Sequence, residues 1–264
     1  MPGSSPLPSG NGAGRVHQPV VLVTGASSGI GSAVAARLAA EGRWRLLLSG
    51  RDEGRLTEIA TVTSGTALPA DLATEDGCER LAERAIGLHD RVDVLVASAG
   101  VGGAGPFADM PPAAIDNLLT VNLSAMLRLV RLLLPGMVAR GRGHVVMIGS
   151  IAGRLGVRQE AVYAASKGAL ATFAESLRYE LAGTGVRVTM VIPGVVDTPF
   201  FDRRGVPYRR SWPRPVPAER VAEAVCQALA RGCDDVFVPP WLALPVRLYG
   251  AMPGLFRKLA TRLG

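Results

Sequence analysis

The chain has 264 residues, of which 48% are hydrophobic and 19% are charged, and its formal net charge is +7. This composition is typical of a folded globular protein and excludes a charge-rich disordered chain. The positive charge suits a nucleic acid, an acidic membrane, an anionic ligand or simply a solvated surface rich in arginine. The basic residues are spread along the chain without a nucleic-acid-binding motif, so we expect no nucleic-acid partner.

The cysteines and the N-terminal residues indicate the compartment. Cys78, Cys226 and Cys233 form no C-x-x-C pair and have no metal-ligand spacing with the histidines, so we expect reduced thiols, no metal site and a cytoplasmic location. Residues 1–18 are rich in glycine, serine and proline, which predicts a disordered arm rather than a secretion signal. No run of 18 or more apolar residues occurs, so the sequence predicts no transmembrane segment.

Short apolar runs alternate with helical patterns through residues 19–238. The predicted strands are Val20–Val23, Trp44–Leu48, Ala67–Pro69, Val92–Ala97, His144–Ile148, Val186–Ile192 and Val236–Val238. The predicted helices are Ile30–Ala40, Glu75–Leu88, Ala113–Ala139 with an interruption at Pro135, Ala161–Leu181 and Ala218–Arg231. Strands that alternate with helices form parallel sheets with right-handed crossovers. The sequence therefore predicts an α/β fold, a single Rossmann-type domain with a doubly wound parallel sheet of about seven strands flanked by helices.

Two further segments are singled out by composition. Residues 198–217 contain several prolines and arginines without either period, which predicts a long substrate loop of the lid or binding kind. Residues 239–264 form an apolar and basic tail in which Leu255, Phe256, Leu259 and Leu263 share one helical face. Such an amphipathic tail more often packs on its own domain or on a partner subunit, and peripheral contact with an anionic membrane is the alternative.

The glycine-rich residues 24–31 lie between the first predicted strand and the first predicted helix. Glycines let the backbone approach a pyrophosphate, and a helix N-terminus offers unpaired N–H groups, so this loop predicts a dinucleotide site. Its candidate cofactor-binding residues are Gly25, Ser27, Ser28, Gly29, Ile30 and Gly31. After the second strand, Arg51 stands where a fold that prefers NAD carries an acidic residue. A guanidinium pairs well with a 2′-phosphate, so NADP(H) is favoured and NAD(H) is the alternative.

A tyrosine and a lysine lie one helical turn apart, at Tyr163 and Lys167. A nearby ammonium favours the phenolate form, which lets a tyrosine act as a general acid/base near neutral pH. Only one other lysine occurs in the chain, which suggests that an ammonium is needed at position 167. Ser150 follows a buried strand at the sheet edge where ligands bind. Asn122 interrupts an apolar helical run, where it either bends the helix or holds a water on a proton path.

Taken together, these residues give the chain a resemblance to the short-chain dehydrogenases/reductases from about Val20 to Val238. The resemblance rests on Thr24-Gly-x-x-x-Gly-x-Gly31, Asp71, Ala99-Gly100, Asn122, Ser150, Tyr163-x-x-x-Lys167 and Pro193-Gly194. It implies a catalytic tetrad in which Tyr163 is the acid/base and Ser150 polarises the substrate oxygen. In that tetrad Lys167 lowers the pKa of Tyr163 and holds the nicotinamide ribose, and Asn122 maintains a water relay.

The same resemblance extends the cofactor site beyond the glycine loop. It implies cofactor contacts for Asp71, Leu72, Ser98, Ala99, Gly100, Tyr163, Lys167, Pro193, Gly194, Val196 and Thr198. One departure is Ser98, where the family commonly has asparagine, and this implies a modest loss of rigidity.

The resulting prediction is an NADP(H)-dependent oxidoreductase that transfers a hydride between nicotinamide and a ketone or secondary alcohol. Aromatic and basic residues mix in 200–212, which suits an apolar small-molecule substrate, including one whose anionic group meets Arg209 and Arg210. One alternative is a reductase of carrier- or CoA-bound acyl substrates. Another is a non-catalytic nucleotide-binding regulatory protein, against which the complete tetrad stands. The resemblance also implies a homodimer or homotetramer.

Overall fold

The computed structural model describes residues 18–206, 208, 213–254, 256 and 258. The predicted N-terminal arm lies almost entirely outside the described residues. Arg209 and Arg210 also lie outside them, as do Leu255, Leu259 and Leu263 of the predicted amphipathic face.

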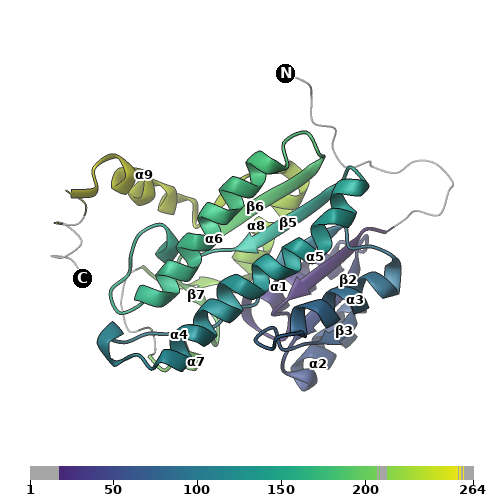
Figure 1. The fold of residues 1–264 in the computed structure, drawn as a ribbon, viewed down its shortest axis with the longest axis horizontal. Helices are drawn as coiled ribbons and strands as arrows, with labels where there is room; N and C mark the ends of the chain where they lie inside the picture. Colours follow the sequence, from purple (N-terminus) through teal and green to yellow (C-terminus); the bar gives the residue numbers. More distant parts are fainter. Residues whose placement is uncertain (1–17, 207, 209–212, 255, 257, 259–264) are drawn as a thin grey trace.

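A seven-stranded parallel sheet forms the centre of the molecule, in the order β3-β2-β1-β4-β5-β6-β9 (Figure 1). Its strands are β1 (Val20–Thr24), β2 (Arg45–Gly50), β3 (Thr66–Pro69), β4 (Val94–Ala97), β5 (Gly143–Ile148), β6 (Val186–Pro193) and β9 (Asp235–Val238). All six pairings are parallel. The predicted Rossmann-type doubly wound sheet is confirmed.

Helices cover both faces of the sheet and bury two separate cores. One core lies under α1 (Gly29–Ala40), α2 (Glu53–Thr63) and α8 (Ala218–Arg231). The other lies under α3 (Gly77–His89), α5 (Ala125–Ala139) and α6 (Ala161–Glu180). Alternate strand residues point to opposite faces, so Leu22 belongs to the second core while its neighbours Val21 and Val23 belong to the first.

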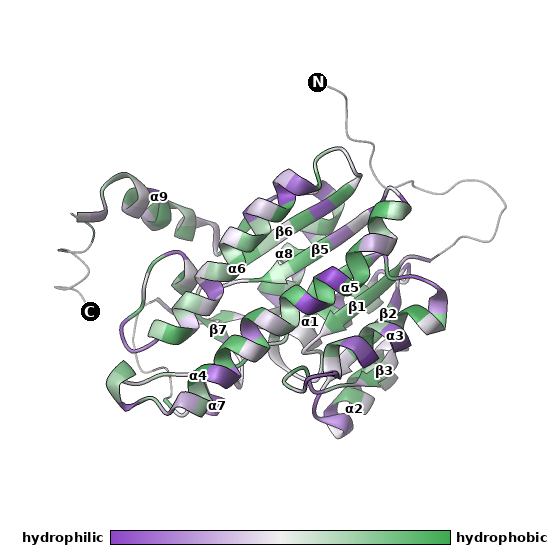
Figure 2. Cartoon of the chain, viewed as in Figure 1, coloured by the Kyte–Doolittle hydropathy of each residue, from purple (hydrophilic) through white to green (hydrophobic). Residues whose placement is uncertain are grey.

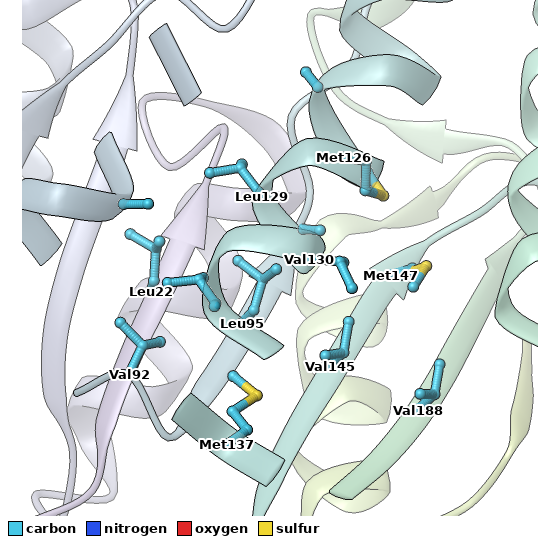
Figure 3. Packing of buried hydrophobic residues seen from close by; sticks show 14 of the residues in the cluster. Leu22, Val92, Leu95, Met126, Leu129, Val130, Met137, Val145, Met147 and Val188 are labelled. Atoms are coloured by element: carbon cyan, nitrogen blue, oxygen red, sulfur yellow. The ribbon is translucent and has the colours of Figure 1, made fainter. Parts of the chain in front are cut away.

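Packing in the second core is seen from close by in Figure 3. Leu95 and Val145 on the sheet lie beneath Leu129 and Val130 of α5. This burial on both faces explains why the strands are short continuous apolar runs.

The helix α2 was not among the predicted elements. It is rich in threonine, and β-branched residues lower helix propensity. Its ends are nevertheless well defined, because the Asp52 side chain accepts a hydrogen bond from the Arg55 N–H, and Ser64 closes the helix in the left-handed region at φ 52°. Local capping therefore supports a helix that the apolar pattern does not reveal.

The predicted helix Ala113–Ala139 is longer and more varied than expected. It consists of α4 (Pro112–Leu119), a π-helical turn (Thr120–Ser124) and α5. Pro135 lies inside α5 without ending it. Proline removes one helix hydrogen bond, but Leu133 and Met137 are buried on either side of it, and their packing holds the helix together.

The stretch Pro112–Ala139 is long and apolar enough to cross a membrane by length and composition, with a mean hydropathy of 1.5. The core helix of a globular domain passes the same test. Because 44% of its most apolar window is buried inside the protein, the packing of α5 on the sheet accounts for this apolarity.

The segments around the predicted loop contain elements that the sequence did not predict. A two-stranded sheet joins β7 (Val196–Asp197) to β8 (Val216–Pro217), and α7 (Phe200–Arg203) lies between them. After β9, a 3-10 turn (Pro240–Leu242) leads into α9 (Ala243–Ala251). The remaining 3-10 turns are Phe107–Asp109 and Ile151–Gly153. The predicted substrate loop 198–217 thus contains short elements that sequence periodicity does not reveal, because a four-residue helix and two-residue strands are too short to show a period.

Candidate active site

One large cleft, of about 1810 Å³, opens at the carboxyl ends of the strands. This is the edge of an open α/β sheet where ligands bind. The cleft brings together Ser150, Tyr163 and Lys167 with every predicted cofactor-binding residue except Gly31. Asn122 also does not line it.

The glycine loop after β1 requires glycine for geometric reasons. Gly25 has φ +68°, and a Cβ there would lie 2.9 Å from the backbone of Ala99. A Cβ on Gly31 would lie 2.3 Å from the carbonyl oxygen of Gly25, so Gly31 shapes the loop from behind the cleft. The first turn of α1 carries no acidic residue, and its N–H groups are available to an anion. The loop therefore fits a pyrophosphate.

The end of β2 offers polar groups to the same cleft. Arg51 and Arg55 are exposed and line it. The Ser49 hydroxyl also lines it, and this buried oxygen has no hydrogen-bond partner among the described residues. Buried hydroxyls are normally paired, so Ser49 indicates a polar ligand at this end. Two guanidinium groups and an unpaired hydroxyl fit a phosphorylated ribose.

Tyr163 and Lys167 both lie on α6 and are buried at the floor of the cleft. The Lys167 Nζ lies 5.9 Å from the centre of the Tyr163 ring and donates to the carbonyl oxygen of Ile148 at 2.9 Å. Burial raises the pKa of Tyr163 to about 12, and a hydrogen bond with Ser150 opposes this rise. Burial lowers the pKa of Lys167 to about 8. The phenol and the Ser150 hydroxyl therefore lie within hydrogen-bond reach of each other in the cleft.

Asn122 is completely buried in the π-helical turn behind the cleft. Its Oδ1 accepts from the N–H of Val101 at 2.8 Å, and its Nδ2 donates to the carbonyl oxygen of Val101 at 2.9 Å. The Nδ2 also contacts the Ser166 hydroxyl at 3.4 Å. Asn122 therefore fixes the backbone that follows β4, beside Gly100.

Thr24 holds the start of that same backbone segment and was missed as a site residue. The N–H groups of Ser98 and Ala99 both donate to its Oγ1 at 3.1 Å. This anchor keeps the segment ordered although serine replaces the family's usual asparagine at position 98. Its place at the end of the first strand was the available signal in the sequence.

A series of aromatic side chains lines the cleft beside Tyr163. The Phe200 ring lies 5.6 Å from the Tyr163 ring, and Phe201 lies 5.5 Å from Phe200. Tyr208 continues the series at 5.4 Å from Phe201. The sequence predicts an apolar substrate loop here, and Phe200 of this loop lies next to Tyr163.

Two arginines of the same segment contact the core of the site. Arg203 donates to the Ser28 hydroxyl of the glycine loop at 3.0 Å. Arg204 forms a buried ion pair with Glu160, which directly precedes α6. These contacts join residues 175 and 44 positions apart, so no local spacing reveals them.

Residues from beyond β9 complete the lining. Trp241, Leu242, Pro245 and Phe256 reach the cleft from the C-terminal segment. Among the described residues, no group of three or more histidine, cysteine or carboxylate side chains could hold a metal ion.

Comparison with known proteins decides the family. The family described as short chain dehydrogenase matches residues 19–206. The chain belongs to this family. It is accordingly an NAD(P)-dependent short-chain dehydrogenase/reductase, an oxidoreductase acting on a small molecule.

Two relatives are similar in sequence to this chain over most of their length. An uncharacterized oxidoreductase of Myxococcus xanthus is 36% identical over 252 residues, covering 92% of this chain and 96% of the relative. A monensin polyketide synthase putative ketoacyl reductase of Streptomyces virginiae is 38% identical over 191 residues, covering 70% and 73%.

Three similar structures carry a nicotinamide cofactor. A short-chain dehydrogenase of Sphingobium yanoikuyae in complex with NADPH is 28% identical, with a TM-score of 0.80 over 93% of this chain and 96% of that one. An enzyme of Burkholderia phymatum in complex with NAD is 26% identical, with a TM-score of 0.81 over 90% and 94%. An actinorhodin polyketide ketoreductase with NADPH is 30% identical, with a TM-score of 0.79 over 86% and 98%. A nicotinamide cofactor is common to these relatives, whereas the choice between NADP and NAD differs among them.

Proposed function

We propose that this enzyme interconverts a ketone and a secondary alcohol with NADP(H), using Tyr163 as the general acid/base. The observation that carries the proposal is the position of Tyr163, Ser150 and Lys167 in the same cleft as the glycine loop. Acid/base chemistry and dinucleotide binding are thereby combined in one cavity.

The cofactor would be held along the carboxyl edge of the sheet. The glycine loop and the α1 N-terminus would bind the pyrophosphate, and Arg51 with Ser49 would bind the phosphorylated ribose. The predicted cofactor-binding residues from Asp71 to Thr198 line the intervening cleft. When bound, NADPH supplies the hydride that the carbonyl carbon receives. Arg51 favours NADP(H), and NAD(H) is the alternative.

The proton would come from the tyrosine. Tyr163, with a pKa of about 12, is protonated near neutral pH and donates to the carbonyl oxygen during reduction. Ser150 donates a hydrogen bond to the same oxygen and polarises it. The Lys167 ammonium stabilises the phenolate that remains. Asn122, which does not reach the cleft, supports the proton path by fixing the backbone at Val101.

The substrate would be apolar. The rings of Phe200, Phe201 and Tyr208 line its side of the cleft. Arg204, whose guanidinium lies 4.5 Å from the centre of the Phe201 ring, is already paired with Glu160, so its charge is compensated within the protein.

A carrier- or CoA-bound acyl ketone is the second candidate substrate. Relatives named ketoacyl reductase in Nostoc and Streptomyces favour it. Turnover of an acyl thioester in preference to a free ketone would select this candidate.

The deciding experiment combines cofactor binding with turnover of a ketone panel. We expect NADPH to raise the Tm more than NADH does, and Tyr163→Phe to lower kcat by about 100-fold to 10,000-fold. Tyr179→Phe is the matched control, because Tyr179 is exposed on the same helix and should leave kcat unchanged.

Two outcomes would contradict the proposal. Retention of turnover in Tyr163→Phe would remove its acid/base, and the absence of a Tm shift with either cofactor would remove the dinucleotide site. A cofactor shift without turnover of any ketone or thioester would favour the regulatory alternative. The cytoplasmic location and the homodimer or homotetramer stay predictions.

A further inference from the structure

The C-terminal helix α9 carries an exposed apolar stripe. Leu244 and Leu248 lie one turn apart on one face of α9. Trp241, in the 3-10 turn before α9, and Met252, directly after its last residue, continue this spacing at three and four residues. The exposed fractions of these four residues lie between 40% and 71%. None of the residues of α9 is buried, and Figure 1 shows the helix projecting beyond the sheet and its covering helices. Figure 2 shows that hydrophobic residues occupy much of it.

All charged residues of the same segment are basic. Residues 239–264 include four basic residues and no acidic residue. Arg247 is exposed within α9, one turn from Leu244 and next to Leu248, so it flanks the stripe. An exposed apolar face beside basic residues is the pattern of helices that lie in the surface of anionic bilayers.

The stripe borders the mouth of the cleft. Trp241 of the stripe lines the cleft itself, as do its neighbours Leu242 and Pro245, and so does Phe256. Phe256 packs against Tyr249 of α9 at 5.4 Å between ring centres. The segment therefore forms part of the cleft wall and also exposes apolar side chains to solvent beside it.

A second copy of the chain fits the stripe poorly. A two-fold interface places the same patch of both subunits against itself, so Arg247 beside the stripe would bring like charges into that interface. The stripe offers four large side chains, whereas a stable protein interface uses about 20–30 residues on each side. An anionic lipid surface complements both features, because its acyl region takes up apolar side chains and its headgroups attract positive charge.

We propose that the stripe and its basic residues bind the surface of an anionic lipid bilayer. Binding turns the mouth of the cleft toward the bilayer, so apolar ketones or alcohols dissolved in lipid reach Tyr163 directly. The second statement rests on the proposed function, whereas lipid binding is measured without turnover.

The test is co-sedimentation of the full chain with vesicles of phosphatidylcholine alone or with 30% phosphatidylglycerol. We expect binding to the anionic vesicles that weakens as salt is raised, because salt screens the charge attraction. Leu244→Glu/Leu248→Glu should weaken this binding at least about tenfold, since it puts two carboxylates on the inserted face. Arg247→Gln should weaken it about fivefold.

The matched control is Val62→Glu/Leu88→Glu, which adds the same charges at exposed apolar positions on α2 and α3. This control should bind vesicles nearly as well as the wild type. No binding of the wild type to anionic vesicles at low salt would overturn the proposal. So would equal losses in the two double variants, or a wild-type dimer that Leu244→Glu/Leu248→Glu converts to a monomer without changing vesicle binding.

A turnover measurement tests the orientation of the cleft. Leu244→Glu/Leu248→Glu should lower kcat/KM for a long-chain ketone carried in vesicles and leave kcat/KM for a water-soluble ketone unchanged. Equal kcat/KM for the vesicle-borne ketone in the variant and the wild type would overturn entry from the bilayer. Absence of turnover with both ketones in the wild type would instead contradict the proposed function.

Discussion

Tyr163 and Lys167 are both buried, and burial moves their pKa values in opposite directions. The pKa of Tyr163 rises to about 12 and that of Lys167 falls to about 8, because burial favours the neutral form of each group. Near pH 7 the tyrosine therefore holds its proton while the lysine still carries most of its charge. This pair of protonation states suits proton donation to a carbonyl oxygen.

Arg51 is the residue with which the choice of cofactor can be tested. A charge-assisted bond from its guanidinium to a 2′-phosphate should be lost in Arg51→Ala, which raises the Kd of NADPH by about 10-fold to 100-fold. The Kd of NADH, which lacks that phosphate, should stay unchanged. Calorimetric titration of both cofactors measures the difference, with Arg80→Ala on α3 as an exposed control outside the cleft. Equal weakening of both cofactors would show that Arg51 does not read the 2′-phosphate.

At the scale of elements, the sequence predicts the strands and site residues whose patterns depend on burial and local spacing. The strands were found because continuous apolar runs such as Val186–Ile192 are buried on both faces of the sheet. The glycine loop and the Tyr163–Lys167 pair were found because their chemistry depends on near neighbours in the chain. Except for Gly31 and Asn122, the predicted catalytic and cofactor-binding residues line the cleft.

The features that the sequence does not predict are very short elements and contacts between residues far apart in the chain. The four residues of α7 are too few for a helical period. Its neighbours Thr198 and Arg204 contact Gly29 and Glu160, which lie far away in the chain. Only the folded sheet brings these residues together.

The ion pair between Glu160 and Arg204 joins α7 to the start of the catalytic helix. Its side chains are only 16% and 8% exposed, so removing one partner leaves the other charge buried and unpaired. Glu160→Gln and Arg204→Gln should each destabilise the protein, and the double variant should lose less than the sum by more than about 1 kcal/mol. Urea unfolding of the four proteins measures this coupling.

An exposed ion pair provides the control for this double-mutant comparison. Asp76 and Arg80 on α3 form an ion pair whose side chains are more than half exposed, and solvent screens their attraction. Asp76→Asn and Arg80→Gln should therefore show little coupling. Additive losses for Glu160 and Arg204 as well would mean that their pair does not hold α7 in place.

At the scale of the whole molecule, the central sheet separates two cores and carries the site at one edge. His144 lies in β5 near the opposite end of that strand from Ser150 and is 5% exposed. Its Nε2 lies 2.8 Å from the Thr189 hydroxyl of the neighbouring strand. A buried titratable group in the centre of the sheet links the stability of the whole fold to pH.

Stability should fall as pH is lowered below about 6.5, because the unfolded chain protonates His144 while the folded protein does not. Burial, with a smaller effect from Arg187, lowers the pKa of His144 from its usual 6.5 to about 4 in the folded state. Between these two values the unfolded state binds one more proton, so the free energy of unfolding decreases by about 2 kcal/mol from pH 7 to pH 5. Urea unfolding at both pH values, in the wild type and in His144→Gln, isolates this effect from that of other titrating groups. The variant should lose about 2 kcal/mol less than the wild type over this interval, and equal losses would show that His144 is protonated in the folded protein.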